Sequence, residues 1–161
     1  MRILPLVPVP VLIALLAGCQ PSAEQPAPPR TAEQFQADVE ALRAQWQELA
    51  NADDFAGVAD LYTEDAYYVD QYGNITEGRT AIAAYFEQSF PRTSGYDIQV
   101  AGTVMDSEMV ASYGTWAATL TGPAGELPTS GFWQTVGVYQ ADGTLKLRLH
   151  HAMVPAAPPT S

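Results

Sequence analysis

The side chains best suited to acid–base chemistry are Asp70 and the adjacent pair His150-His151. Asp70 ends the run Ala-Tyr-Tyr-Val-Asp, which is otherwise apolar or aromatic. A carboxylate in such surroundings is costly unless it is paired, exposed or used for chemistry. Burial would raise the pKa of Asp70 and suit it to act as a general base near neutral pH. The alternative is that Asp70 simply ends a strand at the solvent-exposed mouth of a pocket.

The two histidines are neighbours, so in a strand they point to opposite faces. Alternating leucines set the buried face of their segment: Leu145, Leu147 and Leu149. This alternation predicts that His151 faces inward, where it could pair with Asp70 or could bond a backbone carbonyl at the edge of the core. Adjacent histidines are poor spacing for metal ligands, and Cys19 is the only cysteine, so we expect no metal and no cofactor.

Two helices precede the strand that ends at Asp70, and a third precedes the strands of the second half, which carry the histidines. Thr31 and Gln34 form a capping box that begins the first helix. An apolar stripe follows at steps of three and four residues: Phe35, Val39, Leu42, Trp46 and Leu49. Asp53 and Asp54 begin a second helix, and the segment after Gly78 predicts a third that ends before Pro91.

The remaining elements read as strands. A strand over 66–70 lies between the second and third helices, with a turn at 71–74 after it. Four long strands follow over 96–105, 109–120, 129–140 and 144–153, with turns at 106–108, 121–125 and 141–143. Helices first and an antiparallel meander afterwards indicate an α+β domain, with three helices on one face of a curved, mainly antiparallel sheet.

The N-terminus has the pattern of a secretory signal. A basic start is followed by an apolar run and then by Leu16-Ala-Gly-Cys19, and the run is shorter than the roughly 20 residues of a spanning helix. This ending resembles the bacterial lipobox, which implies lipidation of Cys19 and, with Gln20 after it, an outer membrane location facing the periplasm. We therefore expect a signal over 1–18, a Pro-rich tether over 19–30, a domain over 31–154 and a disordered tail over 155–161.

The composition excludes some classes of partner. Of the 161 residues, 47% are hydrophobic and 16% charged, which fits one globular domain, and the formal net charge is −11. A surface this acidic argues against binding to nucleic acid or to anionic lipid head groups. Attachment to a membrane would depend on the lipid at Cys19.

The register from Asn51 to Asp70, with Gly78-Arg-Thr-Ala-Ile82 after it, resembles the nuclear transport factor 2-like superfamily. Within it, SnoaL-like cyclases and ketosteroid isomerases are most similar. The resemblance implies a cone-shaped, cystatin-like roll with a pocket and places Asp70 where isomerases carry their general base. Trp46 stands where they carry an oxyanion-binding tyrosine. Gln134 or Thr135 stands at the position of the second, acidic donor, so ordinary ketosteroid isomerase activity is not expected.

The aromatic residues divide into a predicted pocket set and a predicted interface set. The predicted pocket combines aromatic side chains with one polar residue: Trp46, Tyr62, Tyr68, Tyr85, Phe86, Trp116, Phe132 and Gln134. Alternation places Trp133 and Tyr139 on the face opposite to Val136 and Val138, which predicts an outer-face homodimer interface, as in relatives.

Three functions remain open on the sequence alone. The first is a binding module that holds a small apolar molecule in the cone. The second is an isomerase, cyclase or hydratase that uses Asp70 as base, with His151 or a tyrosine as acid. The third is an interaction domain whose pocket is filled by its own aromatic side chains.

Overall fold

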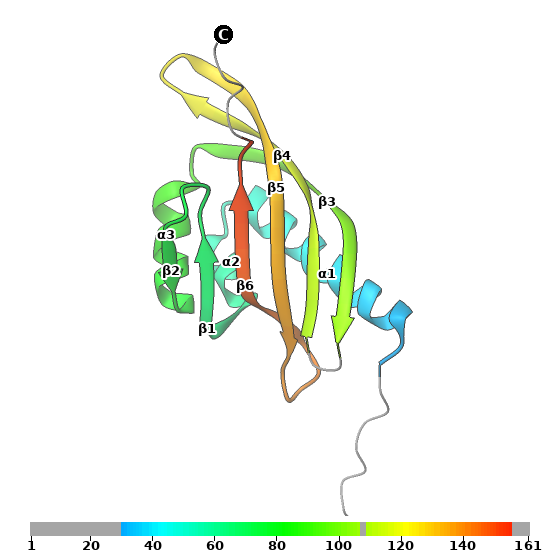
Figure 1. Ribbon diagram of the computed structural model, residues 1–161. Coiled ribbons are helices and arrows are strands. Elements are labelled where there is room, and N and C mark those ends of the chain that lie inside the picture. Colours follow the sequence, from blue (N-terminus) through cyan, green and yellow to red (C-terminus); the bar gives the residue numbers. More distant parts are fainter. Residues whose placement is uncertain (1–29, 107–108, 156–161) are drawn as a thin grey trace, which may run out of the picture.

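The computed structural model describes residues 30–106 and 109–155 (Figure 1). The predicted signal, Cys19, the tether up to residue 29, most of the turn at 106–108 and the tail from residue 156 lie outside the described residues. The elements in chain order are α1 (Ala32–Asn51), α2 (Phe55–Asp60), β1 (Tyr62–Val69), β2 (Ile75–Glu77), α3 (Arg79–Ser89), β3 (Thr93–Asp106), β4 (Met109–Gly122), β5 (Gly125–Tyr139) and β6 (Leu145–Met153).

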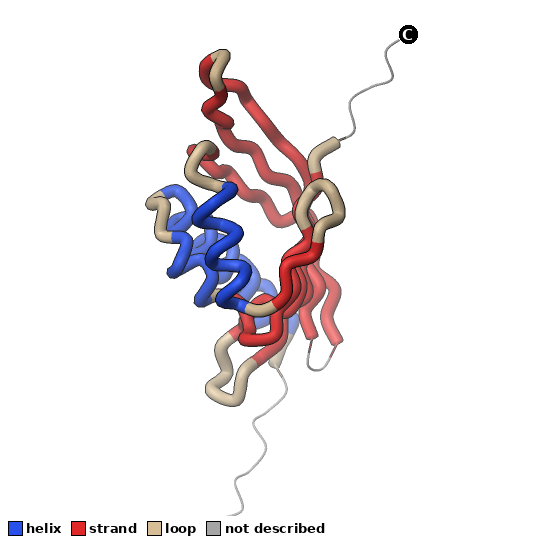
Figure 2. Tube along the Cα trace, turned by 90° about the vertical axis from the view of Figure 1, so that its left-hand side faces the viewer, coloured by secondary structure: helices blue, strands red, loops and turns tan. Residues whose placement is uncertain are grey.

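The strands form one mixed sheet in the order β2-β1-β6-β5-β4-β3. Only β1 and β6 are parallel, and every other neighbouring pair is antiparallel. Figure 2 shows the helices gathered on one side of the curved sheet, with the β4–β5 hairpin extending past them. The predicted α+β class is therefore confirmed, while the short strand β2 was not predicted.

The caps of the first two helices are those that the sequence predicts. Thr31 accepts a hydrogen bond from the Gln34 amide at 3.3 Å, and the Gln34 side chain accepts one from the Thr31 amide at 2.8 Å. Asp54 caps α2 by accepting from the Gly57 amide at 2.9 Å. These bonds satisfy amides that have no partner within a helix, and they fix where α1 and α2 begin.

Strand β6 has one extra residue at a single point of its pairing with β5. Val136 pairs with Leu149, whereas the next residue, Gly137, pairs with Leu147. Arg148 is therefore an extra residue, and Arg148 and Leu149 are both exposed in succession. A bulge of this kind reverses the alternation of side chains beyond it.

Two tryptophans lie over glycines of the neighbouring strand on the inner face. Trp116 of β4 pairs with Gly131 of β5, and Trp133 of β5 pairs with Gly114 of β4. A Cβ atom at Gly131 would lie 2.8 Å from Trp116 Nε1, and one at Gly114 would lie 2.9 Å from Trp133 Cε2. The two glycines leave the space that the indole rings occupy.

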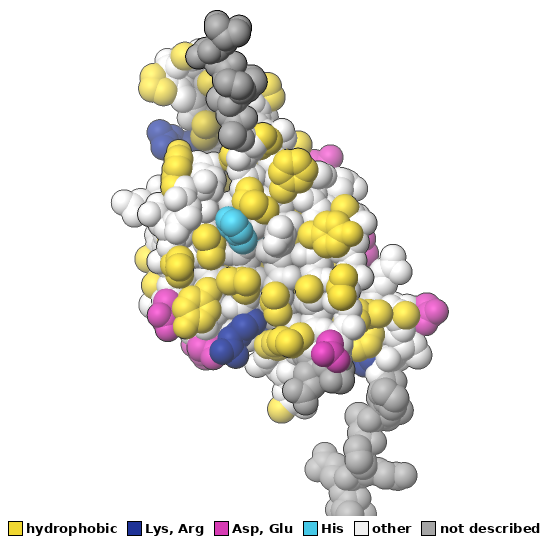
Figure 3. Space-filling model, viewed as in Figure 1, with side chains coloured by type: hydrophobic (Ala, Val, Ile, Leu, Met, Phe, Trp, Pro, Cys, Tyr) yellow, Lys and Arg dark blue, Asp and Glu magenta, His cyan; other side chains and the backbone are white. Residues whose placement is uncertain are grey.

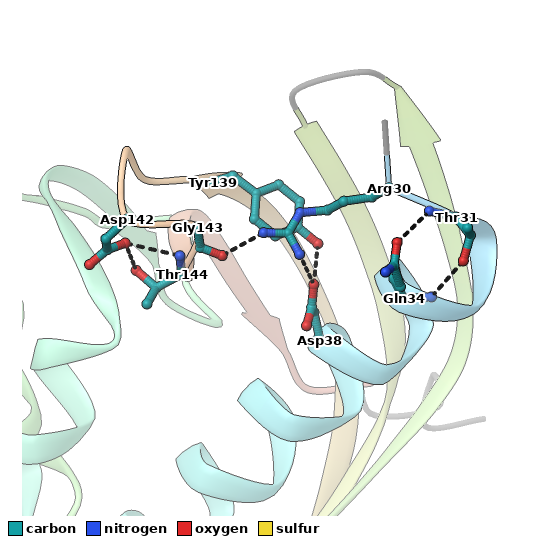
Figure 4. Close-up of polar contacts among 8 residues, drawn as sticks. All are labelled: Arg30, Thr31, Gln34, Asp38, Tyr139, Asp142, Gly143 and Thr144. Atoms are coloured by element: carbon teal, nitrogen blue, oxygen red, sulfur yellow. Dashed lines mark hydrogen bonds and ion pairs between the residues drawn. The ribbon is translucent and has the colours of Figure 1, made fainter. Parts of the chain in front are cut away.

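Arg30 fastens the start of the described chain to the β5–β6 turn (Figure 4). Its guanidinium pairs with Asp38 at 2.9 Å, donates to the Gly143 carbonyl at 2.7 Å and lies 3.9 Å from the centre of the Tyr139 ring. The Tyr139 hydroxyl donates to the same Asp38 carboxylate at 2.8 Å. We call these four residues the Arg30 clasp.

Candidate functional site

A cavity of about 730 Å³ lies between the helices and the inner face of the sheet. All three tryptophans of the chain, Trp46, Trp116 and Trp133, line it. Exposed residues line part of it, among them Tyr72, which is 80% exposed, and Arg92. This volume is within the range of about 300–1,000 Å³ that is typical of pockets for small molecules.

Asp70 lines this cavity, but both of its oxygens already accept hydrogen bonds. Oδ1 accepts from the amides of Tyr72 and Asn74 at 2.8 and 2.9 Å. Oδ2 accepts from Asn74 Nδ2 at 2.9 Å and from the Tyr85 hydroxyl at 3.4 Å. Burial is the largest single influence and by itself raises the pKa, but the bonds from Asn74, Tyr72 and Tyr85 together hold the pKa of Asp70 below its ordinary value. The prediction that burial raises the pKa of Asp70 is therefore wrong.

The inward histidine is His150, not His151. His150 is buried and lines the cavity, whereas His151 pairs with Val69 and Gln134 on the outer face. The extra residue at Arg148 is the reason, because it reverses the alternation that the leucines set. Asp70 and His151 do not face each other, and the predicted acid–base pair is not formed.

His150 is the last member of a buried hydrogen-bonded chain. Trp46 Nε1 donates to the Tyr62 hydroxyl at 3.2 Å, and that hydroxyl lies 2.5 Å from His150 Nδ1. Burial, with a smaller contribution from His151, lowers the pKa of His150 to about 3. His150 is therefore neutral at physiological pH. The indole N–H is the only side-chain donor of Trp46, and because it bonds Tyr62 it is not available to a ligand.

The predicted pocket residues separate into three groups. Four of them line the cavity: Trp46, Tyr68, Tyr85 and Trp116. Tyr62 and Phe86 are fully buried behind the lining. Phe132 and Gln134 are exposed on the outer face, so their assignment to the pocket is corrected.

Strand β5 faces the opposite way from the prediction. Trp133 is buried on the inner face and lines the cavity, and Tyr139 packs edge-on against Phe35 of α1 at 5.7 Å. Neither can belong to an outer-face interface. The outer face instead carries exposed apolar side chains, visible in Figure 3, that include Tyr113, Phe132 and Leu149.

The inward polar side chains that line the cavity are Ser112, Thr135 and His150. Sequence reasoning named Thr135 only as the alternative to Gln134, and it did not place Ser112 or His150 in the pocket. The missed signal lies in Gly114-Thr-Trp116 and Gly131-Phe-Trp133. In each, a glycine two residues before a tryptophan makes room for an indole from the neighbouring strand. This spacing indicates that Trp133 faces inward, and alternation along the strand then places Thr135 on the same face.

The described part of the chain contains neither a cluster of metal-ligating side chains nor a membrane-spanning helix. Within residues 30–106 and 109–155, no group of three or more His, Cys, Asp or Glu side chains is placed to hold a metal ion. No helix in the same ranges is long and apolar enough to cross a membrane.

The sequence and the fold are similar to those of known proteins. The family model described as SnoaL-like domain matches residues 39–146. A ketosteroid isomerase-like protein from Erwinia carotovora atroseptica superposes with a TM-score of 0.70 at 16% identity, over 80% of this chain and 100% of that one. No curated protein sequence matches the chain significantly.

Two other solved structures support the same fold. One is a proposed dehydratase of the NTF2-like family from Streptomyces avermitilis, with a TM-score of 0.67, 15% identity and coverage of 79% and 100%. The other is an NTF2-like protein with a cystatin-like fold from Novosphingobium aromaticivorans, with a TM-score of 0.64, 13% identity and coverage of 78% and 85%. At these identities the similarity establishes the fold, and the predicted cystatin-like roll is confirmed.

Proposed function

Since the chain belongs to the SnoaL-like domain family, whose fold carries many functions, we propose from its cavity that it binds a small, mainly apolar molecule. The observation that carries this proposal is the cavity of about 730 Å³, which three tryptophans line and which opens at one end. A wholly filled interior, as an interaction domain would have, does not fit that volume. Aromatic walls favour a ligand with rings, because rings pack against them edge-on or in offset stacks.

Binding of the neutral dye N-phenyl-1-naphthylamine tests this function. We expect its fluorescence to rise on addition of the protein, with saturation at one dye per chain, and the melting temperature to rise with dye concentration. Leu42→Trp fills the cavity from α1 and should weaken binding at least tenfold. Ala41→Trp places the same side chain on the exposed face of α1 and should leave binding unchanged. Equal binding by the two variants, or none by the wild type, would contradict the proposal.

An isomerase, cyclase or hydratase with Asp70 as base is the second candidate. The observation in its favour is that Asp70 lines the cavity as a carboxylate whose lowered pKa keeps it ionised at neutral pH. To accept a proton from a ligand, Asp70 would have to give up a bond from Asn74 or Tyr85. Binding that survives Asp70→Asn without any turnover in the wild type favours the binding module.

We also propose that Cys19 carries lipid and holds the domain at the outer membrane, facing the periplasm. The support is the sequence Leu16-Ala-Gly-Cys19 after an apolar run. Metabolic labelling with an alkyne-bearing palmitate, followed by separation of the membranes, tests this. The label should enter the wild type in the outer membrane fraction and be absent from Cys19→Ala.

The homodimer remains a proposal, now through different residues. Exposed Tyr113, Phe132 and Leu149 lie on the outer face of β4, β5 and β6, where a second copy could cover them. Two sheets can pack face to face about a twofold axis, each burying the same patch. Sedimentation should report a dimer for the wild type and a monomer for Phe132→Glu, whereas Glu48→Lys on the exposed side of α1 should not change the mass.

A further inference from the structure

Three polar side chains cross the floor of the cavity side by side. His150 of β6 pairs with Thr135 of β5, and Thr135 pairs with Ser112 of β4. All three line the cavity. Neighbouring strands are about 4.8 Å apart, so the three residues span roughly 10 Å across an otherwise mainly apolar floor. We call these three residues the polar row.

The hydrogen bonds behind the row fix the tautomer of His150. The Tyr62 hydroxyl accepts from Trp46, whose indole nitrogen can only donate. Tyr62 is fully buried, so its own proton needs an acceptor, and His150 Nδ1 is the atom in reach. Nδ1 therefore accepts, and the imidazole proton lies on Nε2. A doubly protonated ring would leave the Tyr62 proton without a partner.

The ring is also held in one orientation. Trp46 and Tyr68 pack edge-on against it, with ring centres 5.9 and 5.2 Å away, and Tyr62 lies nearly parallel to it at 6.0 Å. A donor on this ring is positioned before any ligand arrives, so its ordering costs little on binding.

The polar atoms of the row are available to a ligand. Among the residues that the structure describes, His150 Nε2 and the hydroxyls of Ser112 and Thr135 make no hydrogen bond. Within residues 30–106 and 109–155, the only side-chain nitrogen or oxygen that is both fully enclosed and without a hydrogen-bond partner is Trp116 Nε1. The atoms of the row are therefore not sealed off from the cavity that they line.

We propose that the polar row binds the carbonyl oxygen of an uncharged ring compound, with His150 Nε2–H as the donor that orients it and with the Thr135 hydroxyl beside it. This inference rests on the proposed binding function and names the ligand class. The row contains donors but no cation, and the chain carries a net charge of −11, so a carboxylate is a poorer match than a ketone.

A pair of ligands that differ in one group tests the row. 2-Acetylnaphthalene and 2-ethylnaphthalene have the same ring and nearly the same size, but one has a carbonyl where the other has a methylene. An apolar cavity without a donor would favour the hydrocarbon, because burying an unpaired carbonyl is costly. We expect the wild type to bind the ketone at least fivefold more tightly, measured by displacement of N-phenyl-1-naphthylamine.

The variants assign the preference to the row. His150→Phe should reverse the preference, and Thr135→Val, which keeps the shape of the side chain, should reduce it about threefold. His151→Phe changes the neighbouring histidine on the outer face and should keep the preference. The carbonyl stretch of the bound ketone should lie at lower frequency in the wild type than in His150→Phe. If His150→Phe does not fold, the wild-type preference and Thr135→Val still decide the question.

The outcomes separate this inference from the proposed function. If the wild type binds both naphthalenes but prefers the hydrocarbon, the row is not a carbonyl site, while the binding function stands. If neither naphthalene nor the dye binds, both proposals are wrong.

Discussion

The hydroxyl oxygen of Tyr62 lies 2.5 Å from Nδ1 of His150, and this contact joins β1, the first strand along the chain, to β6, the last. Trp46 extends the contact into α1 through its bond to the same hydroxyl. The helix α1 and the strands β1 and β6 thus meet at one buried oxygen. The chain of bonds both supports the core and determines which nitrogen of His150 carries a proton.

His150 should make the stability of the fold depend on pH. Its pKa is about 3 when folded and ordinarily 6.5, so the unfolded state binds the extra proton between these values. Stability is then full above about pH 6.5 and is lost as the pH falls toward 3, by about 1.4 kcal/mol per pH unit from this group. Urea unfolding at pH 7, 6 and 5 measures the slope, which His150→Asn should reduce and His151→Asn should not. An unchanged slope in His150→Asn would contradict the burial of a neutral imidazole.

Tyr62→Phe should destabilise the protein by about 2 kcal/mol or more. It leaves Trp46 Nε1 and His150 Nδ1 without the hydroxyl that bonds both, and an unpaired buried polar group costs about 1–3 kcal/mol. Tyr67→Phe is the matched control on the same strand, because its hydroxyl donates to Glu77 in an exposed position. Denaturant unfolding of the three proteins measures the difference, and equal midpoints for the two variants would show that the buried hydroxyl contributes nothing.

Asp70→Asn should lower the stability of the fold by about 1–3 kcal/mol at neutral pH and leave dye binding intact. An amide keeps one acceptor, and its NH₂ group meets the donors of Asn74 and Tyr72. The pKa of Asp70 is lowered, so its contribution is present above the ordinary value of 3.8 and is lost as the pH falls through the folded pKa. The gap between wild type and variant should therefore be constant from pH 5 to 8 and close below about pH 4. Glu48→Gln, exposed on α1, is the control, and a gap that opens as the pH falls would refute this account.

Gly131→Ala should destabilise the sheet by about 1–3 kcal/mol, the usual cost of overpacking a core. The added methyl group would overlap the Met153 carbonyl and press on the Trp116 indole. Gly122→Ala is the control, because the nearest atom to its new Cβ, the Gly125 carbonyl oxygen, would be 3.9 Å away. Thermal unfolding checks both variants. Trp116 fluorescence should also shift in Gly131→Ala, and a wild-type spectrum and midpoint would contradict the packing described.

The sequence predicted those features that depend on local bonds or on simple periodicity. The capping box at Thr31, the Asp54 cap and the order of the three helices and five of the six strands are determined by residues close together in the chain, and they were predicted correctly; only the three-residue strand β2 was missed. The family register from Asn51 to Asp70 is also local, and it placed Asp70 at the cavity wall.

The faces of β5 and β6 could not be predicted by alternation. In β6 the leucines alternate without a break, and only pairing with β5 shows that Arg148 is extra. In β5 the apolar Val136 and Val138 suggested the buried face, but Gly137 between them is the residue that lies inward. A Cβ atom at Gly137 would lie 2.9 Å from Leu145 Cδ1, so the inner face has room there only for a glycine. These two errors changed the predicted chemistry of the site. The prediction placed His151 and Gln134 in the cavity, whereas His150 and Thr135 line it.

The Arg30 clasp has a consequence for how the domain would stand on a membrane. The clasp grips the β5–β6 turn, where β6 begins, whereas Asp70 follows the end of β1, which runs parallel to β6. The described chain therefore starts at the end of the molecule opposite to the cavity mouth. Ten residues, 20–29, separate Arg30 from Cys19. If Cys19 carries a lipid, as proposed above, the attachment point along the chain lies on the side of the Arg30 clasp, and the Asp70 end of the cavity is the end farther from that attachment.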